Sequence, residues 1–518
     1  MNNIPYLCIG DVSPNGQVSI LDEDRLSYSV LNNSKGAVGI RTISKSLLNE
    51  FIGYIIEHPD NTPTEVRNEL CGRTKIDKFE YGYASTLCIM AQMAISKRNT
   101  YRTDKSNENQ NRLSPDDISY ISAIKTKPFV ILGGFSGTGK SQKVKELAFA
   151  TCPNNSHLRT SETAPGNYLL LSVKPNWHDA TEITGFRSSV NRNYYVTDFM
   201  RFLIKAMHFP NVPFFVCLDE MNLAPVEEYF ADFLSVIESR KKTSSGQIVT
   251  DAIIPASVFN EEYNDNFCIF DCLGFERMDR GMTDDGLHET LLGKFIRIDL
   301  INKIKRDGLT IPSNVIIIGT VNMDDTTNSF SRKVIDRAMT FETVVGKFGD
   351  EYFNSDVALN YVKNPLNGEL FLSDEVRATQ MIDEGRFILT KEEQTKILNF
   401  INDINEDLDG SPFKISYRIL NETILLYRSK KRIAEIMKDE DGLADGVEFK
   451  TDLNTIFDDI LMQKVLPRIE GDYEKCSKCL NKLSSRADNN EWQKSYDKIE
   501  FMIKRFGSDR SGFTSFWN

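Results

Sequence analysis

The chain has 518 residues, enough for about two to four domains of ordinary size. Hydrophobic residues make up 40% of it and charged residues 26%, a balance typical of soluble globular proteins, and no apolar run approaches the roughly 20 residues that span a bilayer. The net charge of −12 argues against nonspecific adhesion to nucleic acid through the whole surface, but it does not exclude a local basic site.

The N-terminus and the cysteines indicate where the protein works. The first residues contain no basic segment followed by an apolar one, so we expect no secretory signal and a cytoplasmic location. The nine cysteines are unevenly spaced, which argues against a disulfide framework. Cys476 and Cys479 form a CxxC pair with no second ligand pair at a suitable spacing, so reduced cysteines on a helix are favoured over a zinc site.

The first part of the chain differs from the rest in its pattern of predicted secondary structure. Residues 1–100 mix short strand-like and helix-like segments, and we expect a small accessory domain there, either α+β or helical. Within it, the apolar spacing over 42–52 predicts an amphipathic helix. Residues 101–117 are rich in Asn, Asp, Ser and Arg, which predicts a linker.

Apolar strands and helices then alternate over 118–350. The continuous apolar runs suit strands that are covered on both faces, so this region is predicted to be an α/β core with a parallel sheet flanked by helices. Four strands are expected, at 127–132, 168–173, 214–218 and 315–320. Residues 351–518 show no comparable strand, and we expect a helical lid with a C-terminal extension.

A glycine-rich turn follows the first of these strands and matches GxxxxGK[ST] in full. Glycines let backbone N–H groups turn toward phosphates, and the helical stretch after the turn offers its positive end. In such a loop the lysine ammonium contacts the β- and γ-phosphates of a nucleotide, and the hydroxyl that follows ligates Mg²⁺. The predicted nucleotide-binding residues are Gly134, Phe135, Ser136, Gly137, Thr138, Gly139, Lys140 and Ser141.

Two acidic residues end the strand at 214–218. Acidic residues after a strand are often helix caps, but together with an upstream phosphate loop they indicate hydrolytic chemistry. We assign Asp219, with Ser141, to the Mg²⁺ ion. Glu220 is assigned to orienting or deprotonating the attacking water.

Three further polar residues follow the strand at 315–320. Asn322 is of the kind that reaches between the water and the γ-phosphate, with a turn asparagine as the alternative. Arg337, and as second choice Arg332, is a candidate arginine finger that enters the next subunit's phosphate site and stabilises transition-state charge. The alternative for both arginines is a solvated helix face.

The order of these segments resembles the McrB-like family, the AAA+ motor subunits of McrBC-type restriction systems. Besides the phosphate loop, the likeness rests on VKPNWHD at 173–179 with 185–186 and 194–197, on LDEMNLA at 218–224 with 229–234 and Glu238, on GTVNMDDTT at 319–327 with VIDRA at 334–338, and on GFTSFW at 512–517. The likeness covers roughly residues 120–518.

The resemblance implies an AAA+ P-loop core, a homo-oligomeric ring, expected to be a hexamer, and nucleotide bound between subunits. It also implies translocation along DNA and a partner resembling McrC that carries the nuclease. Asp219, Glu220, Asn322 and Arg337 match the family's Walker B pair, first sensor and arginine finger, and Arg418 lies where a second-sensor arginine would bind the nucleotide.

One segment departs from the family pattern. The best-known member uses GTP and carries an Asp-Arg-Ser ending after the fourth strand, whereas this chain reads NMDDTT at 322–327. We therefore favour ATP over GTP as the substrate.

Residues 1–100 would bind DNA, as in the family, or dock a partner subunit. A MoxR-like remodelling chaperone acting on a protein, or a nucleotide-dependent assembly switch, are the alternative functions.

Overall fold

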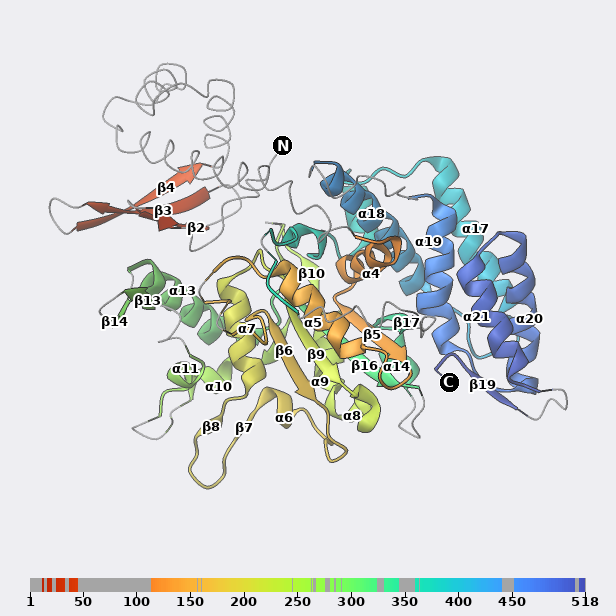
Figure 1. The fold of residues 1–518 in the computed structure, drawn as a ribbon, viewed down its shortest axis with the longest axis horizontal. Coiled ribbons are helices and arrows are strands. Elements are labelled where there is room, and N and C mark those ends of the chain that lie inside the picture. The colour runs from red at the N-terminus through yellow and green to blue at the C-terminus, as the bar shows by residue number, and fades with distance from the viewer. Residues whose placement is uncertain are drawn as a thin grey trace, which may run out of the picture. The chain divides into compact units, whose positions relative to one another are not determined.

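The computed structural model describes four strands between residues 12 and 44 and most of residues 113–517 (Figure 1). Within 113–517 the residues left undescribed are 156, 160, 245, 262, 264–266, 275–279, 284–285, 290, 324–329, 344–358, 363, 440–450 and 508–511. The chain forms two compact units. The first contains residues 1–109, 207–209 and 268–306, and the second contains 110–206, 210–267 and 307–518.

The first unit contains a four-stranded antiparallel sheet in the order β1-β2-β3-β4. Its strands are β1 (Val12–Ser13), β2 (Gly16–Ile20), β3 (Arg25–Asn32) and β4 (Ala37–Ser44). The prediction of a helix over 42–52 is wrong at its start, because Thr42 pairs with Ser27 in the β3–β4 ladder. Alternating β-branched residues favour a strand here. Residues 45–52 of that predicted helix lie outside the described residues.

The same unit contains a second antiparallel pair and two helices. The strands are β13 (Arg280–Thr283) and β14 (Gly286–Glu289). The helices are α11 (Ile269–Cys272) and α13 (Leu291–Asp307), the latter reaching the unit boundary.

A five-stranded parallel sheet forms the centre of the second unit, in the order β17-β5-β16-β9-β6. Its strands are β5 (Phe129–Gly134), β6 (Tyr168–Ser172), β9 (Phe214–Asp219), β16 (Val315–Asn322) and β17 (Met339–Thr343). All residues of β5 and β16 are buried, as expected for strands covered on both faces. The predicted α/β class and its four strands are confirmed, and β17 is an additional edge strand.

Helices flank this sheet (Figure 1). The main ones are α4 (Pro115–Thr126), α5 (Lys140–Thr151), α7 (Asp198–His208) and α9 (Ala231–Glu238). α5 packs against β5, β16 and β9. Ser114 caps α4 in a reciprocal capping box with Asp117, so the helix begins three residues inside the segment predicted as a linker.

Short elements connect the larger ones. They are α6 (Thr181–Thr184), β7 (Phe186–Arg187), β8 (Tyr194–Tyr195), η3 (Met221–Leu223), α8 (Val226–Tyr229), β10 (Lys241–Lys242), β11 (Ile248–Val249), β12 (Ala252–Ile254), α10 (Ala256–Asn260), β15 (Leu309–Thr310) and α14 (Arg332–Ile335). The pairs β7–β8, β10–β11 and β12–β15 are antiparallel.

The C-terminal part of the second unit is mostly helical where it is described. Its elements are η4 (Gly368–Leu370), α16 (Ala378–Asp383), α17 (Lys391–Asp407), α18 (Tyr417–Asp439), α19 (Leu453–Ile460), η5 (Leu461–Val465), η6 (Leu466–Arg468), β18 (Glu470–Asp472), α20 (Tyr473–Asn489), α21 (Gln493–Lys504) and β19 (Phe513–Ser515). Phe400 and Phe457 stack at 4.3 Å in its core, with Trp492 edge-on.

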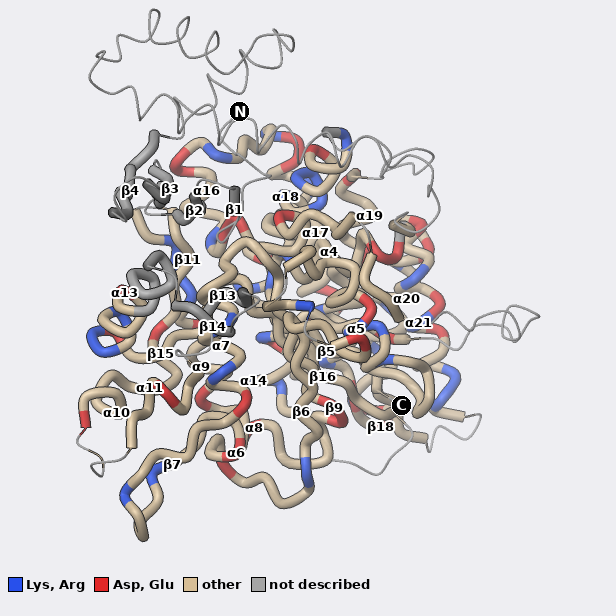
Figure 2. Tube along the Cα trace, turned by 60° about the vertical axis from the view of Figure 1, so that its left-hand side comes forward, with Lys and Arg blue, Asp and Glu red and all other residues tan. Residues whose placement is uncertain are grey.

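Acidic and basic residues are interspersed over the C-terminal helical region, as Figure 2 shows. Cys476 and Cys479 are both buried on α20, and burial raises the pKa of Cys476 to about 12. In the part of the chain that the structure describes, no helix combines the length and the apolar character needed to cross a bilayer.

Candidate nucleotide-binding site

The glycine-rich turn lies at the carboxyl end of β5, as its sequence context predicts. Gly137 and Gly139 have φ angles of +80° and +76°, a region that residues with a side chain rarely adopt. Gly139 is the residue before α5, which starts at Lys140. The turn therefore leads directly into a helix N-terminus, the arrangement that presents backbone N–H groups to a phosphate.

Lys140 folds over this turn. The side chain is only 6% exposed, and its ammonium donates hydrogen bonds to the carbonyl oxygens of Gly134 at 2.9 Å and Phe135 at 2.7 Å. By contrast, Phe135 is 53% exposed at the outside of the turn. The ammonium is thus held on the concave side of the loop, where a phosphate lodged in the turn would meet it.

Ser141 and Asp219 come together from different elements. Ser141 is the second residue of α5, and Asp219 is the last residue of β9, which lies in the same sheet. The Ser141 hydroxyl donates a short hydrogen bond to the Asp219 carboxylate. Two adjacent oxygen donors suit Mg²⁺, which takes few protein ligands and completes its octahedron with water and phosphate oxygens.

Glu220 has a strained backbone. Its φ of 54° and ψ of 51° place it in the left-handed region, which is uncommon for a residue with a side chain. Its backbone N–H donates to the Thr320 hydroxyl at 2.9 Å, and that hydroxyl in turn donates to Asp219 at 2.8 Å. Thr320 therefore fixes both acidic residues at the end of β9.

The amide of Asn322 donates to the Glu220 carboxylate at 2.9 Å. Asn322 is 8% exposed and ends β16, the strand between β5 and β9. Since carboxyl ends of parallel strands lie at one edge of a sheet, the predicted loop, acidic pair and asparagine converge there.

Threonines that the sequence reasoning missed connect these parts. Thr320 lies two residues before Asn322 on β16 and so on the same face of the strand. Thr343, the last residue of β17, donates to the Gly133 carbonyl at 2.9 Å, and its hydroxyl lies 3.1 Å from that of Thr138 in the turn. The only sequence signal was a polar side chain at the end of a strand.

Two neutral side chains lie beneath Asp219. Burial, followed by the charge of Asp219, raises the pKa of Cys217 to about 12. Burial also raises the pKa of Tyr168, as do Cys217 and Asp219. Both groups stay protonated at neutral pH, so they add no negative charge beside the carboxylate.

The three predicted arginines lie elsewhere in the second unit. Arg337 Nε is 3.6 Å from Glu238 Oε1, and Arg418 Nη2 is 2.5 Å from Glu238 Oε2. Lys127, two residues before the start of β5, is 4.0 Å from the same carboxylate. Arg332 donates to the Pro412 carbonyl at 2.6 Å.

This arginine cluster is thus at the amino-terminal edge of the sheet. Lys127 and Gly134 are seven positions apart along extended chain, a span of about 20 Å. The structure brings Arg337 and Arg418 together, but it does not bring either to the chain's own phosphate loop.

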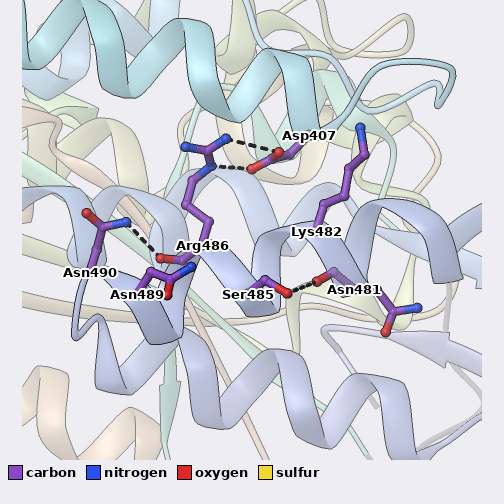
Figure 3. A pocket seen from close by; sticks show the side chains of 7 residues that line it. All are labelled: Asp407, Asn481, Lys482, Ser485, Arg486, Asn489 and Asn490. Atoms are coloured by element: carbon purple, nitrogen blue, oxygen red, sulfur yellow. Dashed lines mark hydrogen bonds and ion pairs between the residues drawn. The ribbon is translucent and has the colours of Figure 1, made fainter.

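A hollow of about 600 Å³ lies on α17 and α20, and no residue of the phosphate loop lines it (Figure 3). Arg486 lines it and is paired with Asp407 by two hydrogen bonds. The other lining residues are Asn481, Lys482, Ser485, Asn489 and Asn490. Because Arg486 is already paired with Asp407, we assign no ligand to this hollow.

Comparisons with known proteins give a match to a family model and a weak likeness to solved structures. A family model described as a domain of unknown function (DUF8727) matches residues 372–511, which is less than half of the chain. No curated protein matches. One similar solved structure is a "putative ATPase" from Cytophaga hutchinsonii ATCC 33406, with 11% sequence identity and a TM-score of 0.33, covering 70% of this chain and 94% of that one. A likeness this weak does not establish a shared activity.

Proposed function

We propose that this protein is an AAA+ type nucleoside-triphosphate hydrolase, with ATP favoured over GTP. The observation that carries the proposal is the convergence of two hydrogen-bonded pairs beside the phosphate loop, Ser141 with Asp219 and Asn322 with Glu220. A structural turn needs neither pair. A site that positions a metal and a water needs both.

Each residue has a defined task in this proposal. The amides of the turn and the ammonium of Lys140 bind the phosphates, while Ser141 and Asp219 would hold a Mg²⁺ ion, which would supply positive charge to the phosphates. Glu220 orients the water that attacks the γ-phosphorus and accepts its proton. Asn322, already bonded to Glu220, keeps that carboxylate aimed at the water.

The finer proposal is a McrB-like ring motor that moves along DNA and serves a nuclease partner. Besides the resemblance, it is supported by the hairpin of β7 and β8, which projects from the core (Figure 1). Phe186 and Tyr195 stack there at 5.5 Å and are 48% and 61% exposed. Exposed aromatic rings beside a basic residue, here Arg192 on the same hairpin, suit the bases and backbone of a nucleic-acid strand, whereas Arg187 is ion-paired with Glu261.

A hydrolysis assay tests the proposal. We expect the purified protein to release phosphate from ATP in Mg²⁺ and the Glu220→Gln variant to lose at least about 100-fold in rate while it still binds ATP. GTP in parallel tests the nucleotide preference. Binding of neither nucleotide to the wild-type protein would refute the proposal as a whole.

The same hydrolysis assay, with DNA added, tests whether the protein acts on DNA. We expect DNA to raise the rate in the wild-type protein and to have little effect in the Phe186→Ala/Tyr195→Ala variant, whose basal rate should be retained. The Val190→Ala variant, changed at the exposed tip of the same hairpin, is the control. Stimulation by an unfolded protein instead of DNA would favour the MoxR-like remodelling function.

A further inference from the structure

A buried arginine lies apart from the nucleotide site. Arg240 follows α9 and directly precedes β10, and it is only 8% exposed. Its Nη2 atom is fully buried and forms no hydrogen bond. Among the residues that the structure describes, no carboxylate forms an ion pair with this guanidinium, unlike Arg337 and Arg418, which share Glu238.

Arg240 is one of the residues that line a small cavity with mostly apolar walls. The walls are Pro128, Ile237, Ile248, Ile311, Pro312, Val315 and Ile317, and the hydroxyl-bearing residues Thr250 and Ser313 complete the lining. Val315 begins β16 and Pro128 precedes β5, so the cavity lies at the amino-terminal edge of the sheet. The phosphate loop is at the opposite edge.

Charge and size restrict what this cavity can hold. Burial lowers the pKa of Arg240 to about 10, so the side chain remains a cation at neutral pH. A buried cation without a counter-charge is costly, and an anion within hydrogen-bond reach offsets that cost. The cavity measures about 20 Å³, room for roughly one water-sized group. A phosphate or sulfate is too large.

We propose that Arg240 binds a small monovalent anion, either a halide ion such as chloride or the tip of a carboxylate from a second copy of this chain. The unpaired guanidinium supplies the charge, and the apolar walls exclude larger, strongly hydrated anions. The site is independent of the nucleotide site and of the proposed hydrolysis.

Thermal unfolding of the full chain tests the site. In sodium gluconate, whose anion is too large for the cavity, we expect the Arg240→Met variant to unfold about 2–4 °C above the wild-type protein, because it removes an uncompensated buried charge. Replacing gluconate with chloride or bromide at equal ionic strength should raise the wild-type Tm by a similar amount and leave Arg240→Met unchanged. Lys241→Met, which removes an exposed charge next to it, is the matched control.

The arms of this experiment separate the two sources. A wild-type Tm that rises with halide at every protein concentration identifies a free ion. A Tm that ignores halide but rises with protein concentration, and does so only when Arg240 is present, identifies a carboxylate of a second copy. A wild-type Tm that responds to neither, together with a lower Tm for Arg240→Met, would mean that the chain itself neutralises Arg240 and would overturn the proposal.

Discussion

At the scale of single residues, the backbone of the candidate site is strained at Glu220, the residue assigned to orient the water. A side chain in the left-handed region costs about 1–2 kcal/mol, and Glu220 is held there by the hydrogen bond to Thr320. The same backbone turn directs the carboxylate toward Asn322. Strain at this position is therefore consistent with a functional requirement.

This strain predicts a difference between two inactive variants. Glu220→Gly and Glu220→Ala both remove the carboxylate, so both should lose hydrolysis. Glycine adopts the left-handed conformation without a penalty, and we expect Glu220→Gly to be about 1 kcal/mol more stable than Glu220→Ala after allowance for its more flexible unfolded chain. Urea unfolding of the two variants measures the difference. Equal stabilities would show that the turn relaxes once the glutamate is gone.

At the scale of elements, the strands of the parallel sheet were the elements that the sequence predicted best. β5, β9 and β16 were found because both of their faces are covered, which produces continuous apolar runs. β6 was found from a similar apolar run, although it lies at the edge of the sheet and is only partly buried. β17 was missed because its sequence, MTFET, alternates and is short. The start of the helix predicted over 42–52 is β-strand because pairing with β3 outweighs a helical spacing of apolar residues.

Some residues of the candidate site could likewise be predicted from the sequence, and others could not. The loop, Asp219, Glu220 and Asn322 each follow a recognisable strand, so their meeting at one edge could be predicted. Thr320 and Thr343 could not, because their partners are distant in the chain and a threonine inside a strand has no distinctive pattern. The location of Arg418 beside Glu238 depends on how α18 packs, which no local signal reveals.

One helix pair yields a prediction about pH. Glu393 caps α17 with Thr390 and also accepts hydrogen bonds from Tyr427 and Lys431 of α18. Although partial burial favours the protonated carboxyl, the bonds from Tyr427, Thr390 and Lys431 lower the pKa of Glu393 to about 2. A lowered folded-state pKa stabilises the fold above the unfolded value of about 4.5, and this stability is lost as the pH falls toward 2.

We therefore expect Glu393→Gln to destabilise the protein by about 1 kcal/mol at pH 7 and by less than half of that at pH 3. Glutamine keeps the capping geometry, so the change isolates the charge. Thermal unfolding across this pH range measures it, with Glu392→Gln, the exposed neighbour, as the control. A difference that does not depend on pH would show that the charge of Glu393 contributes no stability.

At the scale of the whole molecule, the two edges of the sheet have different chemistry. The phosphate loop and the acidic pair lie at the carboxyl edge, and Arg337 lies at the other edge with Glu238, Arg418 and Lys127. A span of about 20 Å is beyond the reach of an arginine side chain. If Arg337 stabilises charge on a transferred phosphoryl group, it does so at the site of another copy, and Glu238 holds it in place until then.

Mixing two inactive variants tests this arrangement. Arg337→Ala subunits keep Glu220, and Glu220→Gln subunits keep Arg337, so a site between one of each is complete. In a ring assembled at random from equal amounts, about a quarter of the interfaces have the productive order, and we expect up to about that fraction of wild-type hydrolysis. Lys333→Ala, an exposed change on α14 four residues before Arg337, replaces Arg337→Ala in the control and should be active alone. Hydrolysis that stays at the level of the separate variants at every mixing ratio would exclude Arg337 as the shared residue and leave Arg332 to be tested in the same way.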